Sequence, residues 1–276
     1  MVDKSQKFNR PNYYNNNDNK NISNKTSKSF EQVVKQETIE KLNNLIQKLA
    51  LKLKKENINV TNDCRIDMDS FESIYSDIKN DKRYIETIRG KMSNTDYIGE
   101  PVEILTTIVW NKVLGDRLIV VRTSMFDDIK NGVDNLIVEK KTGKTICAID
   151  DVSSLSTTFV NKTEKIFHQN NAINVKNIKY GLTIKDGQTL LTHLERVPVF
   201  CIGIPLSGVD QFANYISDSI DSKPSLEEQK LMEYYYRLLE MQIRQYDLSI
   251  VAADLEKLIP DTIKKELKYY KTQNTR

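Results

Sequence analysis

Three apolar runs between residues 117 and 152 constrain the fold of this chain more than any other feature. They are Arg117–Thr123, Val133–Glu139 and Thr145–Val152, and each is rich in β-branched residues. Segments rich in Asp, Asn, Lys and Gly separate the runs, and Lys141–Gly143 has the composition of a hairpin turn. The pattern predicts three consecutive β-strands, with a hairpin between the second and the third.

Helical patterns surround these strands. Residues 99–114 carry apolar side chains at helical spacing and stop at Gly115, and a further helix is expected at about 156–170. Two more strands are predicted at Ile178–Leu182 and Val197–Gly203. A helix, three strands, a helix and further strand material indicate an α/β core over residues 98–205 rather than a helical bundle.

The regions outside this core have a different composition. Residues 1–30 are rich in Asn and Lys and poor in apolar residues, which predicts a disordered tail. Residues 31–97 form an N-terminal helical region, with a long amphipathic helix at 31–56 and shorter helices at 69–79 and about 82–90. Residues 206–276 form a C-terminal helical region, with helices over 209–220 and within 225–271.

Composition excludes several kinds of chemistry. The 276 residues carry a net charge of only +3, with three widely spaced cysteines and two histidines. These cannot form a disulfide framework or a zinc-finger motif, and they leave little material for a Ser–His–Asp triad. The chain lacks both an 18-residue apolar run and a secretory h-region. We therefore expect a cytoplasmic protein with no membrane partner, in which any metal chemistry depends on carboxylates.

Acidic residues follow the strand pattern closely. Asp134 begins the second apolar run, and Asp150 and Asp151 come at the end of the third. If these strands are hairpin neighbours, Asp134 and Asp150 lie side by side, and Glu100 on the preceding helix can approach the same point. Carboxylates that converge repel one another unless a cation neutralises them. This arrangement predicts a site for Mg²⁺ or Mn²⁺.

Each of these acids also has a structural interpretation. Asp127 and Asp128 can be turn residues, and Asp150 or Asp151 can cap the helix that follows, although nearby serines are closer candidates. Glu100 can be a first-turn acid that the helix dipole favours. A carboxylate at the end of a buried apolar strand is costly unless it is used, which favours a functional role for the aspartates at the strand ends.

The order of elements and acids resembles that of the PD-(D/E)XK nuclease superfamily, in particular a bacterial or phage subgroup. The resemblance covers about residues 98–205 and depends on the segments Phe126–Asp134 and Ala148–Asp150. It implies a restriction-endonuclease-like mixed sheet and a metal-dependent nuclease that cuts DNA, or less readily RNA. Asp134 and Asp150 would be metal ligands, with Glu100 as a third or outer ligand.

The sequence departs from the family pattern at Val152, where the motif has lysine. In some family members this lysine lies on the following helix, where the chain has Lys162 and Lys165. The resemblance then gives Lys162, or alternatively Lys165, the role of positioning the attacking water. The departure keeps open a catalytically inactive relative that acts as a scaffold for nucleic acid or protein.

Partners follow from these interpretations. Nucleic acid would contact lysines near the cleft, and a second copy of the chain could pair through the flanking helices. The phosphate-contact candidates are Lys130, Lys140, Lys141, Lys144 and Lys176. A third interpretation is a metal-dependent hydrolase of small phosphoesters.

Overall fold

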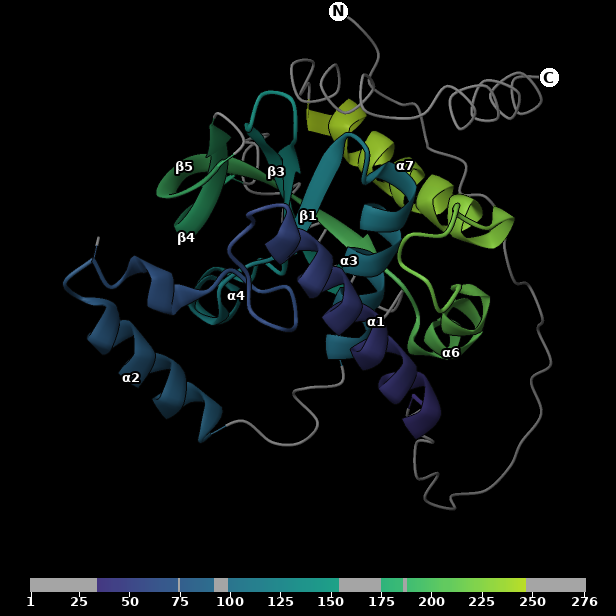
Figure 1. The fold of residues 1–276 in the computed structure, drawn as a ribbon, viewed down its shortest axis with the longest axis horizontal. Coiled ribbons are helices and arrows are strands. Elements are labelled where there is room, and N and C mark those ends of the chain that lie inside the picture. The colour runs from purple at the N-terminus through teal and green to yellow at the C-terminus, as the bar shows by residue number, and fades with distance from the viewer. Residues whose placement is uncertain (1–33, 74, 92–98, 154–174, 186–187, 247–276) are drawn as a thin grey trace, which may run out of the picture. The chain divides into compact units, whose positions relative to one another are not determined.

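The structure is a computed structural model that describes residues 34–73, 75–91, 99–153, 175–185 and 188–246. Helices and strands are mixed along this part of the chain (Figure 1), which confirms the predicted α/β class. The elements are α1 (Gln36–Lys55), a 3-10 turn (Met68–Phe71), α2 (Ile78–Arg89), α3 (Glu100–Leu114), β1 (Leu118–Arg122), α4 (Met125–Asn131), β2 (Asn135–Glu139), β3 (Thr145–Val152), β4 (Val175–Lys185), β5 (Gln188–Gly203), α6 (Leu206–Tyr215) and α7 (Leu226–Tyr246).

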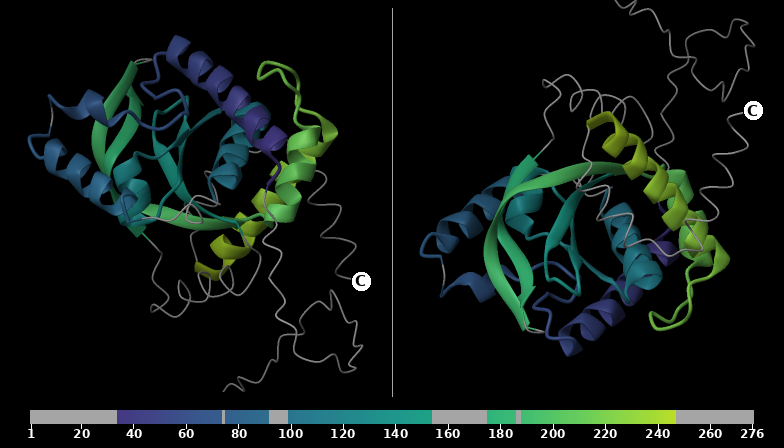
Figure 2. Two further views of the ribbon diagram at one scale, coloured as in Figure 1. Left: turned by 90° about the horizontal axis from the view of Figure 1, so that it is seen from below. Right: turned by 90° about the horizontal axis from the view of Figure 1, so that it is seen from above.

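The described strands form a five-stranded sheet in the order β1-β2-β3-β5-β4. β1, β2 and β3 are antiparallel neighbours, whereas β3 and β5 run parallel. β5 is long and bent (Figure 2): residues up to Pro198 pair with β4, and Val199–Gly203 pair with β3. β3 is therefore central, and its end at Asp150 and Asp151 lies between β2 and β5.

Helix α3 lies at the centre of the hydrophobic core. It contacts β1 and β3 as well as α1, α6 and α7, and in Figure 1 α1 crosses in front of it. Such a helix needs apolar residues on most of its surface, and α3 buries Val102, Leu105, Ile108, Val109 and Trp110 among others. By contrast, α1 buries only a stripe, from Leu42 to Leu53, and keeps its lysine-rich face outside.

A buried ion pair joins α3 to α7. Nζ of Lys112 lies 2.6 Å from Oε1 of Glu228, and both side chains are fully buried. The Glu228 carboxylate also accepts hydrogen bonds from the backbone N–H groups of Ser217 and Ser225. Because both charges are removed from water, their attraction must offset a large desolvation cost, and the additional hydrogen bonds help to do so.

Helix α7 also contacts the part of β5 that pairs with β3 but not with β4. The Gln242 side chain accepts a hydrogen bond from the backbone N–H of Cys201 at 2.9 Å and donates one to its carbonyl at 2.7 Å. The Tyr234 hydroxyl donates to the carbonyl of Gly203. These contacts satisfy backbone groups that would otherwise be open to pairing with another strand.

The structure corrects one turn between the strands. The sequence suggested a turn for Asp127 and Asp128, but Met125–Asn131 form the short helix α4. The Ser124 hydroxyl caps its N-terminus by accepting a hydrogen bond from the Asp127 N–H, and Gly132 ends it with a left-handed backbone at φ 61°. α4 therefore projects between β1 and β2 and returns the chain to the sheet at Asp134.

Other differences concern the bounds of elements. The helix predicted at 69–79 is a 3-10 turn at Met68–Phe71, and α2 begins at Ile78. β4 and β5 are longer than the strands predicted at 178–182 and 197–203, and α6 occupies Leu206–Tyr215 rather than 209–220. The predicted tail at 1–30, the helix at 156–170 and the helical pattern beyond residue 246 lie outside the described residues.

Candidate metal centre

Three carboxylates from three different elements converge at one end of the sheet. Glu103 lies on α3, Asp128 on α4, and Asp134 directly before β2. One oxygen of each carboxylate can be chosen so that all three lie within 4.8 Å of one another. Asp134 is buried, and the other two side chains are 15% and 22% exposed. Three hard oxygen donors at this spacing can hold a metal ion.

Backbone contacts fix the position of Asp134. Its N–H donates to the carbonyl of Ile149, and its own carbonyl accepts from the N–H of Thr123, so the residue lies between the ends of β1 and β3. Its Oδ2 accepts a hydrogen bond from the backbone N–H of Asp151 at 2.5 Å. The carboxylate is therefore held at the sheet end, although it lies in a loop position.

The surroundings of Asp134 favour its protonated form when no cation is bound. Burial raises the pKa of Asp134 well above its ordinary value, and the charges of Glu103, Asp151, Asp128 and Asp150 raise it further. Burial also raises the pKa of Asp128, where the charge of Arg65 opposes the change. A divalent cation is the natural counterion for such a group of carboxylates.

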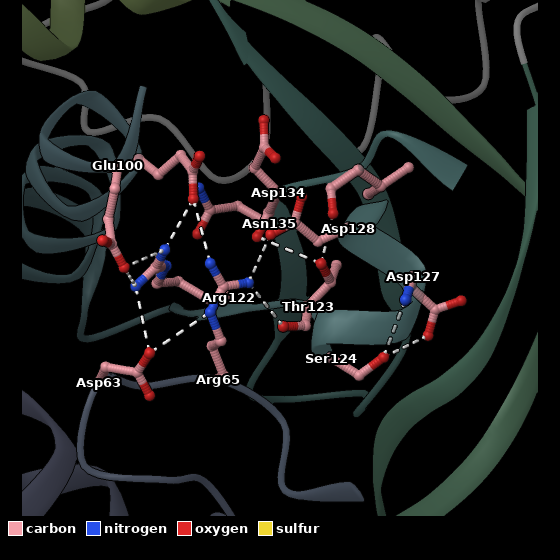
Figure 3. Close-up of polar contacts among 12 residues, drawn as sticks. Asp63, Arg65, Glu100, Arg122, Thr123, Ser124, Asp127, Asp128, Asp134 and Asn135 are labelled. Carbon is pink, nitrogen blue, oxygen red and sulfur yellow. Dashed lines mark hydrogen bonds and ion pairs between the residues drawn. The ribbon is translucent and has the colours of Figure 1, made fainter. Parts of the chain in front are cut away.

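Two arginines lie against this acidic triad (Figure 3). Nη2 of Arg122 donates to Oε2 of Glu103 at 2.7 Å, and Arg65 donates to Oδ2 of Asp128 at 2.8 Å. Their further acidic partners, Asp63 and Glu100, are 42% and 45% exposed. The triad and these two acids thus carry five carboxylates against two guanidinium groups, so the arginines neutralise only part of the negative charge.

A polar network extends from the triad into the core. The Asp151 carboxylate accepts hydrogen bonds from Thr106 at 2.8 Å and from Asn135 at 2.7 Å, and Asn135 in turn accepts one from Thr107. Burial raises the pKa of Asp151 to about 8, despite the hydrogen bond from Thr106. The network fixes α3 relative to β2 and β3, and therefore fixes Glu103 relative to Asp134.

Asp127, next to Asp128 in the sequence, has a structural role. Its carboxylate accepts hydrogen bonds from the backbone N–H groups of Lys179 and Tyr180, both at 2.9 Å, and from the side chains of Ser124 and Asn131. Lys179 and Tyr180 belong to β4, so these two bonds tie α4 to that strand. The two neighbouring carboxylates therefore have different roles. Asp127 joins α4 to the sheet, and Asp128 belongs to the triad.

The residues that the sequence predicted to be catalytic do not all belong to the triad. Asp134 belongs to the triad, whereas Glu100 is half-exposed and pairs with Arg122 at 3.4 Å. Asp150 is partly buried on β3, one residue beyond the Asn135–Ile149 pair, with its Oδ2 3.9 Å from Sγ of Cys201. Lys162 and the alternative Lys165 lie outside the described residues.

The lysines proposed as phosphate contacts are dispersed. Nζ of Lys130 lies 5.3 Å from the ring centroid of Tyr84, and Lys140 pairs with Glu56 at 2.7 Å. Lys130, Lys141 and Lys144 are exposed, and Lys176 is partly exposed at the start of β4. Of these, Lys130 is the one on the same helix as Asp128.

Sequence reasoning missed Glu103, Asp128 as a ligand, and both arginines. Glu103 had a detectable signal, because it lies one helical turn after Glu100 and shares its face of α3. Arg122 also had one, as a charge that ends an apolar strand. Arg65 had none, because it lies in an irregular segment far from the core in sequence.

Comparisons with known proteins give no assignment: no family model, curated protein or solved structure matches this chain. Within the residues that the structure describes, none of the helices combines the length and apolar character needed to cross a membrane.

Proposed function

We propose that this protein is a metal-dependent nuclease that hydrolyses phosphodiester bonds in DNA. The observation that carries the proposal is the acidic triad of Glu103, Asp128 and Asp134 at the end of the sheet. Glu103 lies on the helix and Asp134 beside the second strand, where the family resemblance expects acids, whereas Asp128 on α4 is an acid that the resemblance does not include.

The topology of the sheet supports the same proposal. α3 precedes three antiparallel strands, and β5 returns parallel to the third of them. The order of α3, β1, β2, β3 and β5 supports the helix–three strands–helix–strand order expected for a restriction-endonuclease-like fold, although α4 lies between β1 and β2 and the helix expected at 156–170 lies outside the described residues. The β4 arm of the β4–β5 hairpin is an addition to that order.

The donor set suits a hard divalent cation. Glu103, Asp128 and Asp134 offer only carboxylate oxygens, which favour Mg²⁺ or Mn²⁺ over softer metals. Such an ion would lower the pKa of a bound water and stabilise negative charge on a phosphate oxygen. Asp150, whose charge raises the pKa of Asp134, would be an outer carboxylate of the same centre.

Other residues of the chain position this donor set. Arg122 holds Oε2 of Glu103, and the N–H of Asp151 holds Oδ2 of Asp134, so both carboxylates are oriented before any ligand arrives. Exposed Lys130, on the same helix as Asp128, would contact a neighbouring phosphate. In this proposal Glu103 takes the place that the sequence gave to Glu100, and Lys162 keeps its proposed role.

A cleavage assay tests the proposal. The full chain would be incubated with fluorescently labelled single- and double-stranded DNA in Mn²⁺, in Mg²⁺ and in EDTA. We expect fragments that require the metal and that disappear with Asp134→Asn. Asp116→Asn, at an exposed turn after α3, is the matched control and should cut like the unmodified protein.

The two rival functions give different results in the same assay. A catalytically inactive scaffold would bind DNA or a protein without producing fragments in any metal. A hydrolase of small phosphoesters would cleave bis-p-nitrophenyl phosphate in a metal-dependent way and leave DNA intact. Either result would overturn the nuclease proposal.

A further inference from the structure

Arg65 reaches the centre from a part of the chain that precedes the core by more than thirty residues. Its neighbour Cys64 has a left-handed backbone at φ 61°, and the Arg65 N–H donates to the Thr61 hydroxyl, so the chain turns sharply before Arg65. The N–H of Ile66 then bonds the carbonyl of Arg122, and the N–H of Arg122 bonds the carbonyl of Cys64. These bonds attach the segment to the end of β1.

The guanidinium of Arg65 contacts two of the three triad carboxylates. Nη1 lies 2.8 Å from Oδ2 of Asp128, and Nη2 lies 3.3 Å from Oε2 of Glu103. Nε is buried and has no hydrogen-bond partner among the described residues, although Oδ2 of Asp63 lies 3.3 Å away. Arg65 therefore bridges Asp128 and Glu103, and its Nε faces Asp63 as an ion pair without hydrogen-bond geometry.

Arg122 differs from Arg65 in access to solvent. The Arg122 side chain is fully buried, whereas 8% of the Arg65 side chain is exposed. The half-exposed side chain of Asp63 contacts both guanidinium groups (Figure 3), and it is the most exposed of the three acidic partners of Arg65. Both guanidinium groups are buried, and Arg65 is the less deeply buried of the two.

We propose that Arg65 is the phosphate-binding residue of this centre, and that it exchanges between the carboxylates of Asp128 and Glu103 and a phosphate of the nucleic acid. This inference rests on the proposed function and adds a phosphate contact beside the role proposed for Lys162. The planar fork of a guanidinium fits carboxylate and phosphate oxygens equally well, so one side chain can serve both partners. Arg65 then competes with a divalent ion for the two carboxylates.

Because Arg65 competes with the metal ion, its removal should have opposite effects on the affinities for Mn²⁺ and for DNA. Arg65→Met leaves the triad with more negative charge, so we expect Mn²⁺ to bind about threefold to tenfold more tightly, as affinity follows the net charge of the ligands. The same variant loses a phosphate contact. We therefore expect it to bind a DNA oligonucleotide, in a buffer that contains Ca²⁺, about tenfold more weakly than the unmodified protein does. Calorimetry with Mn²⁺ alone and fluorescence anisotropy with labelled DNA measure these two affinities without any cleavage.

Two further variants complete the experiment. Arg83→Met, on the exposed side of α2, removes the same charge away from the centre and should change neither affinity by more than about twofold, because surface charges act weakly through solvent. Arg65→Lys keeps the charge but cannot bridge both carboxylates. Arg65→Lys should therefore show tighter Mn²⁺ binding and weaker DNA binding, each to a smaller extent than Arg65→Met. It tests the inference if Arg65→Met does not fold.

The results separate this inference from the nuclease proposal. If the unmodified chain does not bind Mn²⁺, the metal centre and the role of Arg65 both fail. If it binds Mn²⁺ and cleaves DNA, but the Arg65 variants have both affinities equal to those of Arg83→Met, the inference about Arg65 alone is wrong. Opposite shifts in the two affinities support it.

Discussion

The backbone N–H of Asp151 donates a hydrogen bond to Oδ2 of Asp134 at 2.5 Å. This bond joins the last turn before β2 to the end of β3, so the Asp134 carboxylate is held by the sheet rather than by its own loop. The Asp151 side chain points elsewhere, to Thr106 and Asn135. One residue therefore fixes the triad with its main chain and the helix–sheet packing with its side chain.

Replacing Asp134 by Asn should separate metal binding from folding. The amide oxygen can still accept the hydrogen bond from Asp151, but the ligand charge is lost, so we expect Mn²⁺ affinity to fall by at least about tenfold. Removing a carboxylate that Glu103 repels should leave the melting temperature in EDTA at pH 8 unchanged or higher. Calorimetry and thermal melting test both parts, and a variant that melts much lower would contradict this interpretation.

Glu100 and Glu103 provide a matched pair on one helix. Glu103 contributes an oxygen to the triad, whereas Glu100 is half-exposed and pairs only with Arg122 among the contacts of the described residues. We expect Glu103→Gln to lower Mn²⁺ affinity by about tenfold and to abolish DNA cleavage, whereas Glu100→Gln changes either by less than about threefold. Equal losses in the two variants would restore Glu100 as a ligand and contradict the structure-based assignment.

The stability of the metal-free protein should fall as the pH rises. Burial raises the pKa of Asp151 from 3.8 to about 8 and raises that of Asp134 as well, so the folded state binds protons more tightly than the unfolded state does. This contribution to stability is complete below pH 3.8 and is lost as the pH rises toward 8. Urea unfolding in EDTA between pH 5 and 9 should show the decline.

Saturating Mn²⁺ should reverse this pH dependence, because the ion takes the place of the protons and its affinity increases as the carboxylates ionise. The same urea series in Mn²⁺ then gives a free energy of unfolding that is level or rises with pH. A decline of equal size with and without Mn²⁺ would show that the ion does not bind these carboxylates.

The Lys112–Glu228 pair predicts a stability effect that is independent of the site. Lys112→Met leaves the Glu228 charge buried without its partner, which costs about 3–5 kcal/mol. Adding Glu228→Gln removes that charge and keeps an oxygen for the N–H groups of Ser217 and Ser225, so the double variant should recover much of the loss. Urea unfolding of both variants measures this, and equal stabilities would show that the charge is not the cause.

Local patterns predicted much of the α/β core. The apolar runs at 117–152 match β1, β2 and β3 within a few residues, because a strand that is buried on both faces is recognisable from β-branched residues alone. α4 was missed because seven residues are too few for a helical period. Ser124, a residue type that caps helices, and Gly132, a residue type that ends them, were the signals that the sequence offered for it.

The triad was only partly accessible to sequence reasoning. Asp134 was found because it begins a strand, but Asp128 resembled a turn residue and Glu103 was passed over for Glu100. Arg65 comes to the centre through tertiary contacts with β1, which no periodicity or motif reveals. The residues that neutralise the site therefore depend on packing between segments that are distant in sequence.

A crystal of the protein soaked in Mn²⁺ and measured at the manganese absorption edge tests the central claim most directly. We expect an anomalous peak within about 2.0–2.6 Å of oxygens from Glu103, Asp128 and Asp134, the distances typical of a divalent ion held by carboxylates. A map without a peak there, with Arg65 still bridging Asp128 and Glu103 at saturating Mn²⁺, would contradict it.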